Sequence, residues 1–412
     1  MRSFFIILIF LLFAKSFSQE KDLLFYIEKA QSNSPLLKDL SNQIQSNTID
    51  SLLIRASFKP RVSGNINANY APNYNGFGYD TAVSNGQSLS GLVGISQKII
   101  SKNTINSQNE TFKIIKEGLV LNKKIATKDL NKAIAAQYIA AFGSSEQVVY
   151  NQKMKELLKN ESVILKKMTQ NSIYKQTDYL IFISTLKQQE LQLIELKQQH
   201  QNDLGLLNYL SGETDTSFVN LTSPNITLRS MQKEETTIFK KQFETDSLKI
   251  INQSKLIDNS YKPALSLLGD AGYLSSFANQ GYRNFGFSIG LGLSIPIYDG
   301  NQKTLLYQKN ETALATNLAY KSNFQKQYQQ QLLMLNLRLK QTIEIQNQLQ
   351  SQLQIIDALI EADKKLLLSG DAQITDFMIA IANVININNT ISQNKINNLQ
   401  LINEINYWST ND

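Results

Sequence analysis

An internal duplication is the feature that most constrains how this chain can fold. Residues 59–70 return 203 positions later as residues 262–273, with Lys-Pro at the start and Ala and Tyr near the end of each copy. Residues 90–103 and 177–179 return 198 positions later, as residues 288–301 and 375–377. Three matched blocks in the same order indicate that one folding unit occurs twice in the chain.

Each copy contains two segments with the period of a strand. They lie at about 60–70 and 90–100 in the first copy and about 263–275 and 284–297 in the second. Apolar residues alternate with Gly, Ser, Asn and Asp in these segments, so each predicted strand has one apolar face and one small or polar face. Their length suits strands of a transmembrane barrel, which need about 9–11 residues. A soluble sandwich with a buried apolar face is the alternative, but no further sheet is predicted to cover that face.

The rest of each copy is predicted to be helical. Residues 23–58 favour one helix that ends before Pro60. Residues 103–168 and 301–368 predict two very long helices, the second roughly 100 Å long at 1.5 Å per residue. Apolar residues with the spacing of a coiled-coil seam run through the second one: Leu332, Leu335, Leu339, Ile343, Leu349, Leu353, Ile356, Ile360 and Leu367. The pattern breaks near Ser172 and near Gly370, where a second helix runs back, so two helical hairpins are expected.

The first 18 residues have the pattern of an export signal. Arg2 precedes an apolar run of about ten residues, and residues 16–18 supply small side chains for cleavage before Gln19. The run is too short to be a membrane anchor, which needs about 20 residues. Removal of the signal leaves 39 basic and 34 acidic residues, a mild balance without the concentrated positive charge of a nucleic-acid-binding protein.

Composition argues against several kinds of chemistry. The chain has no Cys and one His, which excludes disulfides, thiolate sites and polyhistidine metal clusters. His200 stands in a polar run and is predicted to lie on a solvated helix face. The acidic residues on the helices have no nucleophile, base or metal spacing beside them. We therefore expect no enzyme activity, no cofactor and no metal.

The order of these elements resembles the TolC-like outer-membrane efflux protein family. The resemblance rests on the tyrosines that end the Pro-led strands, on residues 296–301 between strand and long helix, and on residues 368–370 followed by Asp376. It covers the chain from about Leu23 to Trp408. It implies an α+β membrane protein that forms a homotrimer, with a 12-stranded β-barrel in the outer membrane continued by an α-helical periplasmic tunnel. Four strands of one chain cannot close a barrel, which independently favours oligomerisation if the strands lie in lipid.

In that family, the helix tips form a gate of carboxylates and contact the adaptor protein of a pump. The resemblance assigns this role to residues around the two hairpin turns: Gly370, Asp371, Asp376, Ile379, Ser172 and Asp178. Some relatives carry a second acid where this chain has Ile379, so an apolar constriction is the alternative to a double acidic ring. A basic residue that is common in the family is replaced by Ala372. Each Asp also has a purely local interpretation, as a helix N-cap or a first-turn charge favoured by the helix dipole.

Aromatic residues near the loop ends of the strands are candidates for a belt at the membrane interface, although they could also pack the loops together. These residues are Tyr70, Tyr273, Phe285 and Phe287.

The predicted organisation is a signal peptide at 1–18, a first repeat at 19–211, a linker or equatorial segment at 212–230 and a second repeat at 231–412. The function that the resemblance implies is a passive exit duct of a tripartite efflux or type I secretion system, in the outer membrane of a Gram-negative bacterium with a large periplasmic part. Its expected partners are a periplasmic adaptor (membrane fusion protein), an inner-membrane transporter and outer-membrane lipid, and no nucleic acid. The alternative is a secreted or periplasmic coiled-coil scaffold or adhesin without a pore.

Overall fold

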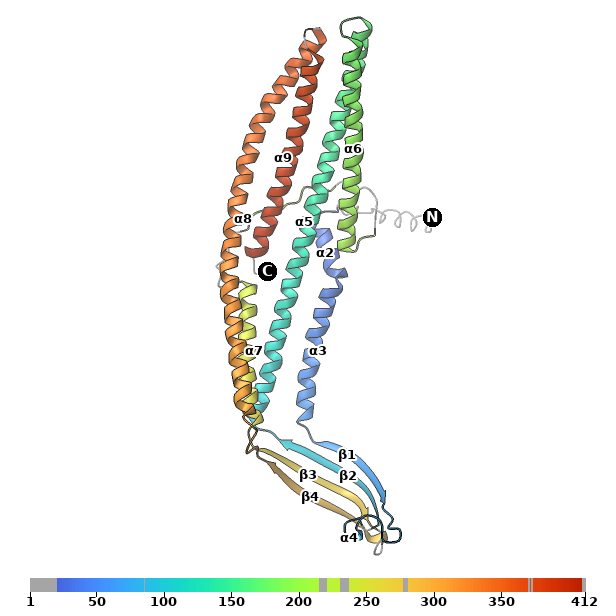
Figure 1. Ribbon diagram of the computed structural model, residues 1–412, viewed down its shortest axis with the longest axis vertical. Coiled ribbons are helices and arrows are strands. Elements are labelled where there is room, and N and C mark those ends of the chain that lie inside the picture. The colour runs from blue at the N-terminus through green and yellow to red at the C-terminus, as the bar shows by residue number, and fades with distance from the viewer. Residues whose placement is uncertain are drawn as a thin grey trace, which may run out of the picture. The chain divides into compact units, whose positions relative to one another are not determined.

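The computed structural model describes residues 21–84, 86–214, 221–229, 237–276, 281–369, 371 and 373–409. The predicted signal peptide therefore lies outside the described residues. The elements are α2 (Leu23–Asn33), α3 (Pro35–Ser57), β1 (Arg61–Tyr70), α4 (Thr81–Ser84), β2 (Gln87–Ile99), α5 (Lys102–Gln170), α6 (Gln176–Ser211), α7 (Ile238–Ser260), β3 (Ala264–Ser275), η2 (Gly281–Arg283), β4 (Phe285–Ser294), α8 (Gln302–Ser369) and α9 (Ile374–Ser409). Figure 1 labels all of them except η2.

The duplication is visible in these bounds. Adding 198 to both ends of α6 gives the bounds of α9, and each helix has 36 residues. Likewise, β3 begins 203 residues after β1 and β4 begins 198 residues after β2. The two offsets found in the sequence are thus reproduced by the elements themselves.

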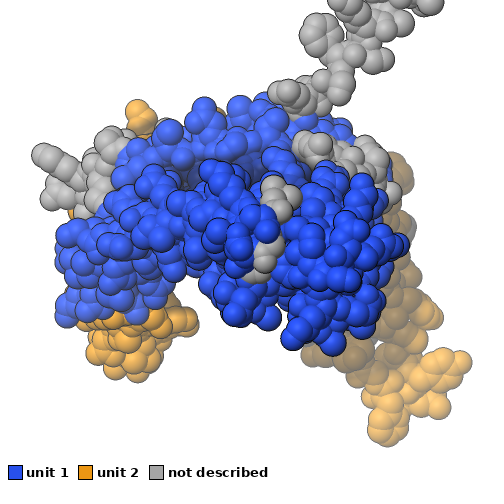
Figure 2. All heavy atoms as spheres, turned by 90° about the horizontal axis from the view of Figure 1, so that it is seen from above, with its two compact units in different colours: residues 1–37, 124–237, 325–412 blue, residues 38–123, 238–324 orange. Residues whose placement is uncertain are grey.

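Contacts divide the chain into two compact units, which Figure 2 colours separately. Unit 1 consists of residues 1–37, 124–237 and 325–412, and unit 2 consists of residues 38–123 and 238–324. The long helices α5 and α8 each supply residues to both units. Each unit therefore combines segments from both predicted repeats.

Unit 2 contains one antiparallel sheet with the strand order β1-β2-β3-β4. The central pair, β2 with β3, joins the first repeat to the second in a register that sets Val93 opposite Ala271. The fourth strand ends at Ser294, three residues before the predicted end, because Pro296 follows and has no N–H for a ladder hydrogen bond. Figure 1 shows this sheet extending away from the helices of the same unit.

Asparagine side chains tie the helices of unit 2 together. The Nδ2 of Asn47 on α3 donates to the carbonyl of Phe112 on α5 at 2.9 Å. The Nδ2 of Asn252 on α7 donates to Thr111 Oγ1 on α5 at 2.7 Å, and that of Asn317 on α8 donates to the Phe243 carbonyl on α7 at 2.9 Å. A buried amide that finds a specific partner fixes the axial register of two helices, because any sliding would leave it unpaired.

Unit 1 contains the helical hairpins α5–α6 and α8–α9, whose turns lie at the same end of the unit (Figure 1). The predicted seam of α8 is largely buried or half-buried, with Leu335 and Leu367 almost fully enclosed. Ile343 departs from it and is 49% exposed. At this level the buried position belongs to Asn394 of α9, whose Nδ2 donates to the Thr342 carbonyl at 2.9 Å and Gln346 Oε1 at 3.0 Å.

The single helix predicted for residues 23–58 is wrong in one respect, because the structure has two helices there. Helix α2 ends at Asn33, Ser34 is extended, and Pro35 begins α3. Proline cannot donate the backbone hydrogen bond of a helix interior and restricts the residue before it, but it suits a first helical position. The Ser34 Oγ then accepts from the Leu37 amide at 3.3 Å, as a capping side chain does.

Candidate functional sites

Most of the apolar residues of the four strands lie on one face of the sheet. In an antiparallel pair, directly opposite residues share a face, and the register sets Tyr273 opposite Phe285, Leu267 opposite Leu291 and Ile95 opposite Val62. The face consists of Val62, Ile66, Tyr70, Leu89, Val93, Ile95, Ile99, Leu265, Leu267, Ala271, Tyr273, Phe285, Phe287, Ile289, Leu291 and Leu293, with Gly64, Ala68, Gln87, Gly91, Gln97, Gly269 and Ser275 between them. The predicted two-sided pattern of the strands is thus present in the folded sheet.

This apolar face is uncovered in the single chain. Phe287 is 81% exposed and Ile289 is 77% exposed, although both are large and apolar. Soluble monomers rarely expose a continuous apolar surface of this extent, and such surfaces mark contacts with protein or lipid. All four candidate interface aromatics lie on it, near the loop end of the sheet. Tyr273 and Phe285 are in edge contact with ring centroids 5.2 Å apart, whereas Tyr70 lies on the opposite edge strand and is 78% exposed.

The other face of the sheet is small or polar along most of its length. It carries Arg61, Ser63, Asn65, Asn67, Asn69, Ser88, Ser90, Gly94, Ser96, Lys98, Ser266, Asp270, Gly272, Gly286, Ser288, Gly290, Gly292 and Ser294, with Leu92, Leu268 and Leu274 as exceptions. Ser288 Oγ donates to the carboxylate of Asp270 on the neighbouring strand at 2.6 Å. This is a surface that water wets, with little net charge.

The two hairpin turns share one backbone hydrogen bond at equivalent positions. In the first, the Ile173 amide donates to the Met168 carbonyl and the Ser172 amide to the Thr169 carbonyl, both at 3.0 Å. This is the Schellman pattern, and Ser172 occupies its left-handed position with φ 63°. In the second turn, the Asp371 amide donates to the Leu366 carbonyl at 3.0 Å, the same bond displaced by 198 residues. The predicted site residue Gly370 and the neighbouring Ala372 lie outside the described residues.

Both candidate gate aspartates occupy the third position of a helix, where negative charge is favoured by the dipole and by free amides. Asp178 forms the back-reaching half of a capping box, since its Oδ2 accepts from the Lys175 amide at 3.3 Å. Asp376 holds the equivalent position in α9 and is exposed, and its own amide donates to the Gln373 carbonyl at 3.1 Å. Both aspartates therefore hold the first-turn position that the local interpretation predicts, and the Asp376 carboxylate remains exposed to solvent.

Two further candidates surround Asp376. Asp371 is exposed, and its Oδ2 accepts from Ser369 Oγ at 2.7 Å, which fixes the carboxylate within the turn. Ile379, one turn after Asp376 on α9, is 60% exposed. One hairpin turn thus presents two carboxylates and an apolar side chain to its surroundings.

A direct link between the two turns is a feature that the sequence analysis missed. Tyr174 in the first turn donates its hydroxyl to the Leu367 carbonyl near the end of α8 at 3.1 Å. Burial raises the pKa of Tyr174, with smaller contributions from the nearby Asp371 and Asp178, so the phenol stays protonated and remains a donor. No motif marks this residue, because it acts through a backbone carbonyl 193 positions away.

An apolar cluster lies beneath these turns and joins the two hairpins. It comprises Leu158, Leu165, Phe182, Leu186, Ile356, Leu367, Ile374, Phe377, Ile381, Val384, Ile385 and Ile387. Beside it, Lys364 on α8 approaches the buried Glu161 on α5, with 3.4 Å between Nζ and Oε1. The hairpin ends of one chain are therefore packed as a single body, and moving one against the other would break these contacts.

The prediction that His200 lies on a solvated face is wrong. Its side chain is fully buried, and Nδ1 lies 3.1 Å from the Ala141 carbonyl and 3.2 Å from Ser144 Oγ. The polar neighbours in the sequence are misleading, because α6 turns its His200 edge toward α5 while the glutamines face outward. Burial lowers the pKa of His200, which favours the neutral ring.

The described residues contain neither a group of three or more acidic or His side chains able to hold a metal ion nor a helix long and apolar enough to cross a membrane.

Comparison with known proteins gave matches among solved structures only. Neither a protein-family model nor a curated protein sequence matches the chain. The transmembrane channel CusC superimposes with a TM-score of 0.78 at 10% identity, over 95% of this chain and 92% of CusC. The Campylobacter jejuni outer-membrane channel CmeC gives 0.75 at 14% identity, over 95% of this chain and 86% of CmeC. The outer-membrane protein VceC of Vibrio cholerae gives 0.75 at 13% identity, over 94% of this chain and 96% of VceC.

CusC and CmeC are described as channels and VceC as an outer-membrane protein, and all three match the chain over nearly its whole length. At this level of identity the likeness concerns the fold. The chain has the fold of the TolC-like outer-membrane efflux channels, and the resemblance found in its residues is confirmed at that level.

Proposed function

We propose that this protein is a passive exit duct in the outer membrane of a Gram-negative bacterium. It would conduct solutes from an inner-membrane pump and its periplasmic adaptor to the exterior, as part of a tripartite efflux or type I secretion system. The observation that carries the proposal is the apolar face of the four-stranded sheet, where large side chains such as Phe287 and Ile289 are uncovered. Lipid is an environment that stabilises such a face, and the channel fold supports that choice over a protein partner.

The two edges of the sheet support an assembly of more than one copy of the chain. Within the described residues, β1 and β4 each have a partner strand on one side only. Unpaired backbone groups are too costly to leave in a bilayer, and bacterial barrels have at least eight strands. Four strands from each of three copies would close a barrel of 12, the number that the resemblance to the TolC-like family implies. A homotrimer with β1 of one copy paired to β4 of the next is therefore the proposed assembly.

The opposite face of the same strands would support conduction. In a closed barrel it faces the lumen, where Asn65, Asn67 and Ser288 would contact water and passing solutes. The lumen performs no chemistry, and the energy for transport comes from the pump.

The hairpin turns are the proposed gate and the proposed contact for the adaptor. Asp376 and Asp371 would bring carboxylates to the tunnel entrance, and Ile379 would add an apolar constriction. The hydrogen bond from Tyr174 to the Leu367 carbonyl supports a closed state that is stabilised partly by contacts within each chain. The first turn, with Ser172 and Asp178, would also contribute to the gate, and its sequence departs further from the family pattern than that of the second turn.

Conductance of the purified protein in planar bilayers tests the proposal, together with the way it is extracted from envelopes. We expect detergent to be required for extraction and discrete, water-filled conductance steps after reconstitution. A chain that salt or alkali releases from the envelope, and that forms no pores, would instead identify a periplasmic or secreted scaffold.

The gate assignment has its own test. Asp376→Ala should raise the leak through the closed pore, because a ring of carboxylates would lose its charge and its solvation. Glu344→Ala is the control, since Glu344 is an exposed carboxylate in the middle of α8, away from both turns. Unchanged leak in Asp376→Ala, or an equal rise in both variants, would contradict the gate role of Asp376.

A further inference from the structure

Helix α3 carries an uncovered apolar stripe opposite the face that packs within the chain. Asn47, which donates to the Phe112 carbonyl on α5, belongs to the packed face. Ile49, Leu53 and Ala56 occupy the other side of the helix at spacings of four and three residues. Ile49 is 50% exposed and Leu53 is 61% exposed. A surface helix usually has one apolar stripe, so a second stripe indicates a second packing partner.

The part of α8 that lies in unit 2 has an open hollow on its exposed side. The hollow is lined by this helix alone, through Lys309, Thr312, Ala313, Thr316, Asn317 and Tyr320. Thr312 Oγ1 donates to the Gln308 carbonyl at 2.9 Å, and Thr316 Oγ1 donates to the Thr312 carbonyl at 2.8 Å. Both hydroxyls are thus satisfied by their own helix. Small side chains of this kind leave room for the larger side chains of a second helix.

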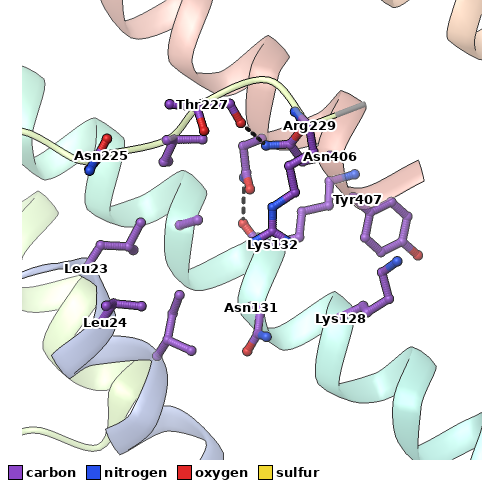
Figure 3. Close-up of a pocket in the computed structure, with 14 residues that line it drawn as sticks. Leu23, Leu24, Lys128, Asn131, Lys132, Asn225, Thr227, Arg229, Asn406 and Tyr407 are labelled. Carbon is purple, nitrogen blue, oxygen red and sulfur yellow. Dashed lines mark hydrogen bonds between the residues drawn. The ribbon is translucent and has the colours of Figure 1, made fainter. Parts of the chain in front are cut away.

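A hollow in unit 1, shown in Figure 3, is built differently because several segments enclose it. Asn406 of α9 donates from Nδ2 to the Thr227 carbonyl at 2.8 Å and accepts at Oδ1 from the Arg229 amide at 2.9 Å. Asn403 Nδ2 donates to the Lys132 carbonyl on α5 at 3.0 Å. These segments are already fastened to one another, whereas every residue that lines the hollow on α8 belongs to that helix.

The duplication indicates which helix would cover these two surfaces. Within the chain, the pairing of β2 with β3 joins the two repeats, β2 leads into α5, and β3 follows α7. In the proposed trimer, β4 of one copy pairs with β1 of the next, β4 leads into α8, and β1 follows α3. Helices α3 and α7 each have 23 residues, and their bounds differ by 203. The contact of α5 with α7 is therefore the repeat equivalent of a contact between α8 and α3 of the next copy.

The contact of α5 with α7 supplies a template for the side chains. Asn259 Nδ2 on α7 donates to Ser107 Oγ on α5 at 3.0 Å. Three turns further along α5, a Cβ added at Gly118 would lie 3.7 Å from Thr245 Cγ2 on α7. These two pairs fix which levels of the two helices lie side by side.

The repeat offsets translate this template into contacts between copies. Adding 198 to the two α5 positions gives Leu305 and Thr316, and subtracting 203 from the two α7 positions gives Ala56 and Asn42. Leu305 would then pack against Ala56 and the nearby Ile49, and Thr316 against Asn42. Leu305 is 60% exposed in the single chain. The polar pair of the template is thus replaced by an apolar pair, which accounts for the uncovered apolar side chains on both helices.

The same translation gives a hydrogen bond between copies. Gln242 Nε2 on α7 donates to Asn122 Oδ1 on α5 at 3.2 Å, and the equivalent residues are Asp39 on α3 and Tyr320 on α8. Tyr320 is 66% exposed, and Asp39 is exposed as well. A phenol donates and a carboxylate accepts, so the pair remains complementary although both residues differ from the template.

We propose that α8 of one copy packs against α3 of the next copy in the register that α5 and α7 have within the chain. The apolar stripe of α3 fills the hollow of α8, and the Tyr320 hydroxyl donates to the Asp39 carboxylate of the neighbouring copy. The proposal rests on the proposed assembly, because it requires a neighbouring copy. It deepens that assembly by naming the side chains that join the helices outside the sheet.

Cysteine cross-linking of the full chain tests the register, and the chain has no Cys of its own that could interfere. We expect the double variants Ala56→Cys/Leu305→Cys and Asn42→Cys/Thr316→Cys, purified in detergent, to form covalent dimers and trimers with a thiol-specific reagent that spans a few ångströms. All four positions are exposed in the single chain, so the substitutions should be tolerated. The size of the untreated protein is measured on the same samples.

The crossed pairs are the matched controls, because they use the same four substitutions. Ala56→Cys/Thr316→Cys and Asn42→Cys/Leu305→Cys would lie roughly 16–21 Å apart along the helices, at 1.5 Å per residue. They should give at least about tenfold less linked product, since thiols must approach closely to be joined. A trimer in which either matched pair links no better than the crossed pairs would overturn the inference and leave the proposed duct standing. A monomeric chain would overturn both.

Discussion

Placing an arginine at the centre of the apolar sheet face gives the sharpest test of the proposed membrane position. Ile289 is the fifth of ten residues in β4, lies on that face and is 77% exposed in the single chain. If the face contacts lipid, Ile289→Arg brings a cation close to the bilayer midplane, where the cost is about 2–4 kcal/mol per chain. That corresponds to roughly a 30- to 900-fold change in the folding equilibrium of each chain, and a trimer would contain three such arginines.

Gly290→Arg is the matched control. The residue is adjacent in sequence, faces the polar side, and has open space where a Cβ would be added. The same arginine there should be tolerated, because it would enter water in the lumen.

The assay is urea unfolding of the protein folded into lipid vesicles, with the fraction of assembled trimer measured on the same samples. We expect Ile289→Arg to shift the midpoint strongly and to reduce assembly, and Gly290→Arg to resemble the wild type. In a soluble protein both would be surface substitutions, worth no more than about 0.5 kcal/mol. Indistinguishable behaviour of the two variants would therefore refute the assignment of this face to lipid.

Three further predictions concern unit 1. Tyr174→Phe removes the hydrogen bond to the Leu367 carbonyl, worth about 1 kcal/mol, and should raise closed-state leak roughly fivefold in bilayer recordings; an unchanged leak would deny the link a role in the gate. The pKa of His200 is lowered in the folded chain, so the unfolded chain binds the proton more readily. The free energy of unfolding should therefore have its full value above about pH 6.5 and fall by up to about 1.4 kcal/mol per pH unit below it. Denaturant titrations at several pH values should show a weaker dependence of this free energy on pH for His200→Gln. Gly143→Ala would drive its new methyl group into Ile396 and should destabilise by about 1–3 kcal/mol, a loss that the double variant with Ile396→Ala should partly recover; simple additivity in that double-mutant cycle would contradict the predicted contact.

Much of the fold could be predicted from the sequence because the repeats constrain it. A strand with a strict period of two has to present one face, so the apolar side of β4 follows from its residues alone. The equal lengths of α6 and α9 reflect the duplication that the offset of 198 had indicated.

What could not be predicted depends on contacts between distant segments. The burial of His200 is decided by which edge of α6 packs on α5, and its polar neighbours in the sequence conceal this. Tyr174 acts through a carbonyl, which carries no sequence signature. The break at Pro35 was open to prediction, since proline disfavours a helix interior, but the surrounding Leu and Ile periodicity obscured it.

The two sheet edges with a partner on one side only have a consequence for the newly made chain. A lone copy would present ladder groups at β1 and β4 beside a broad apolar surface, the combination that promotes wrong association between strands. The fraction of native protein would then depend on protein concentration, because the edge strands of one copy are paired only by another copy. In the proposed assembly, such a chain would depend on a holding chaperone during transit, until insertion supplies both neighbours and lipid.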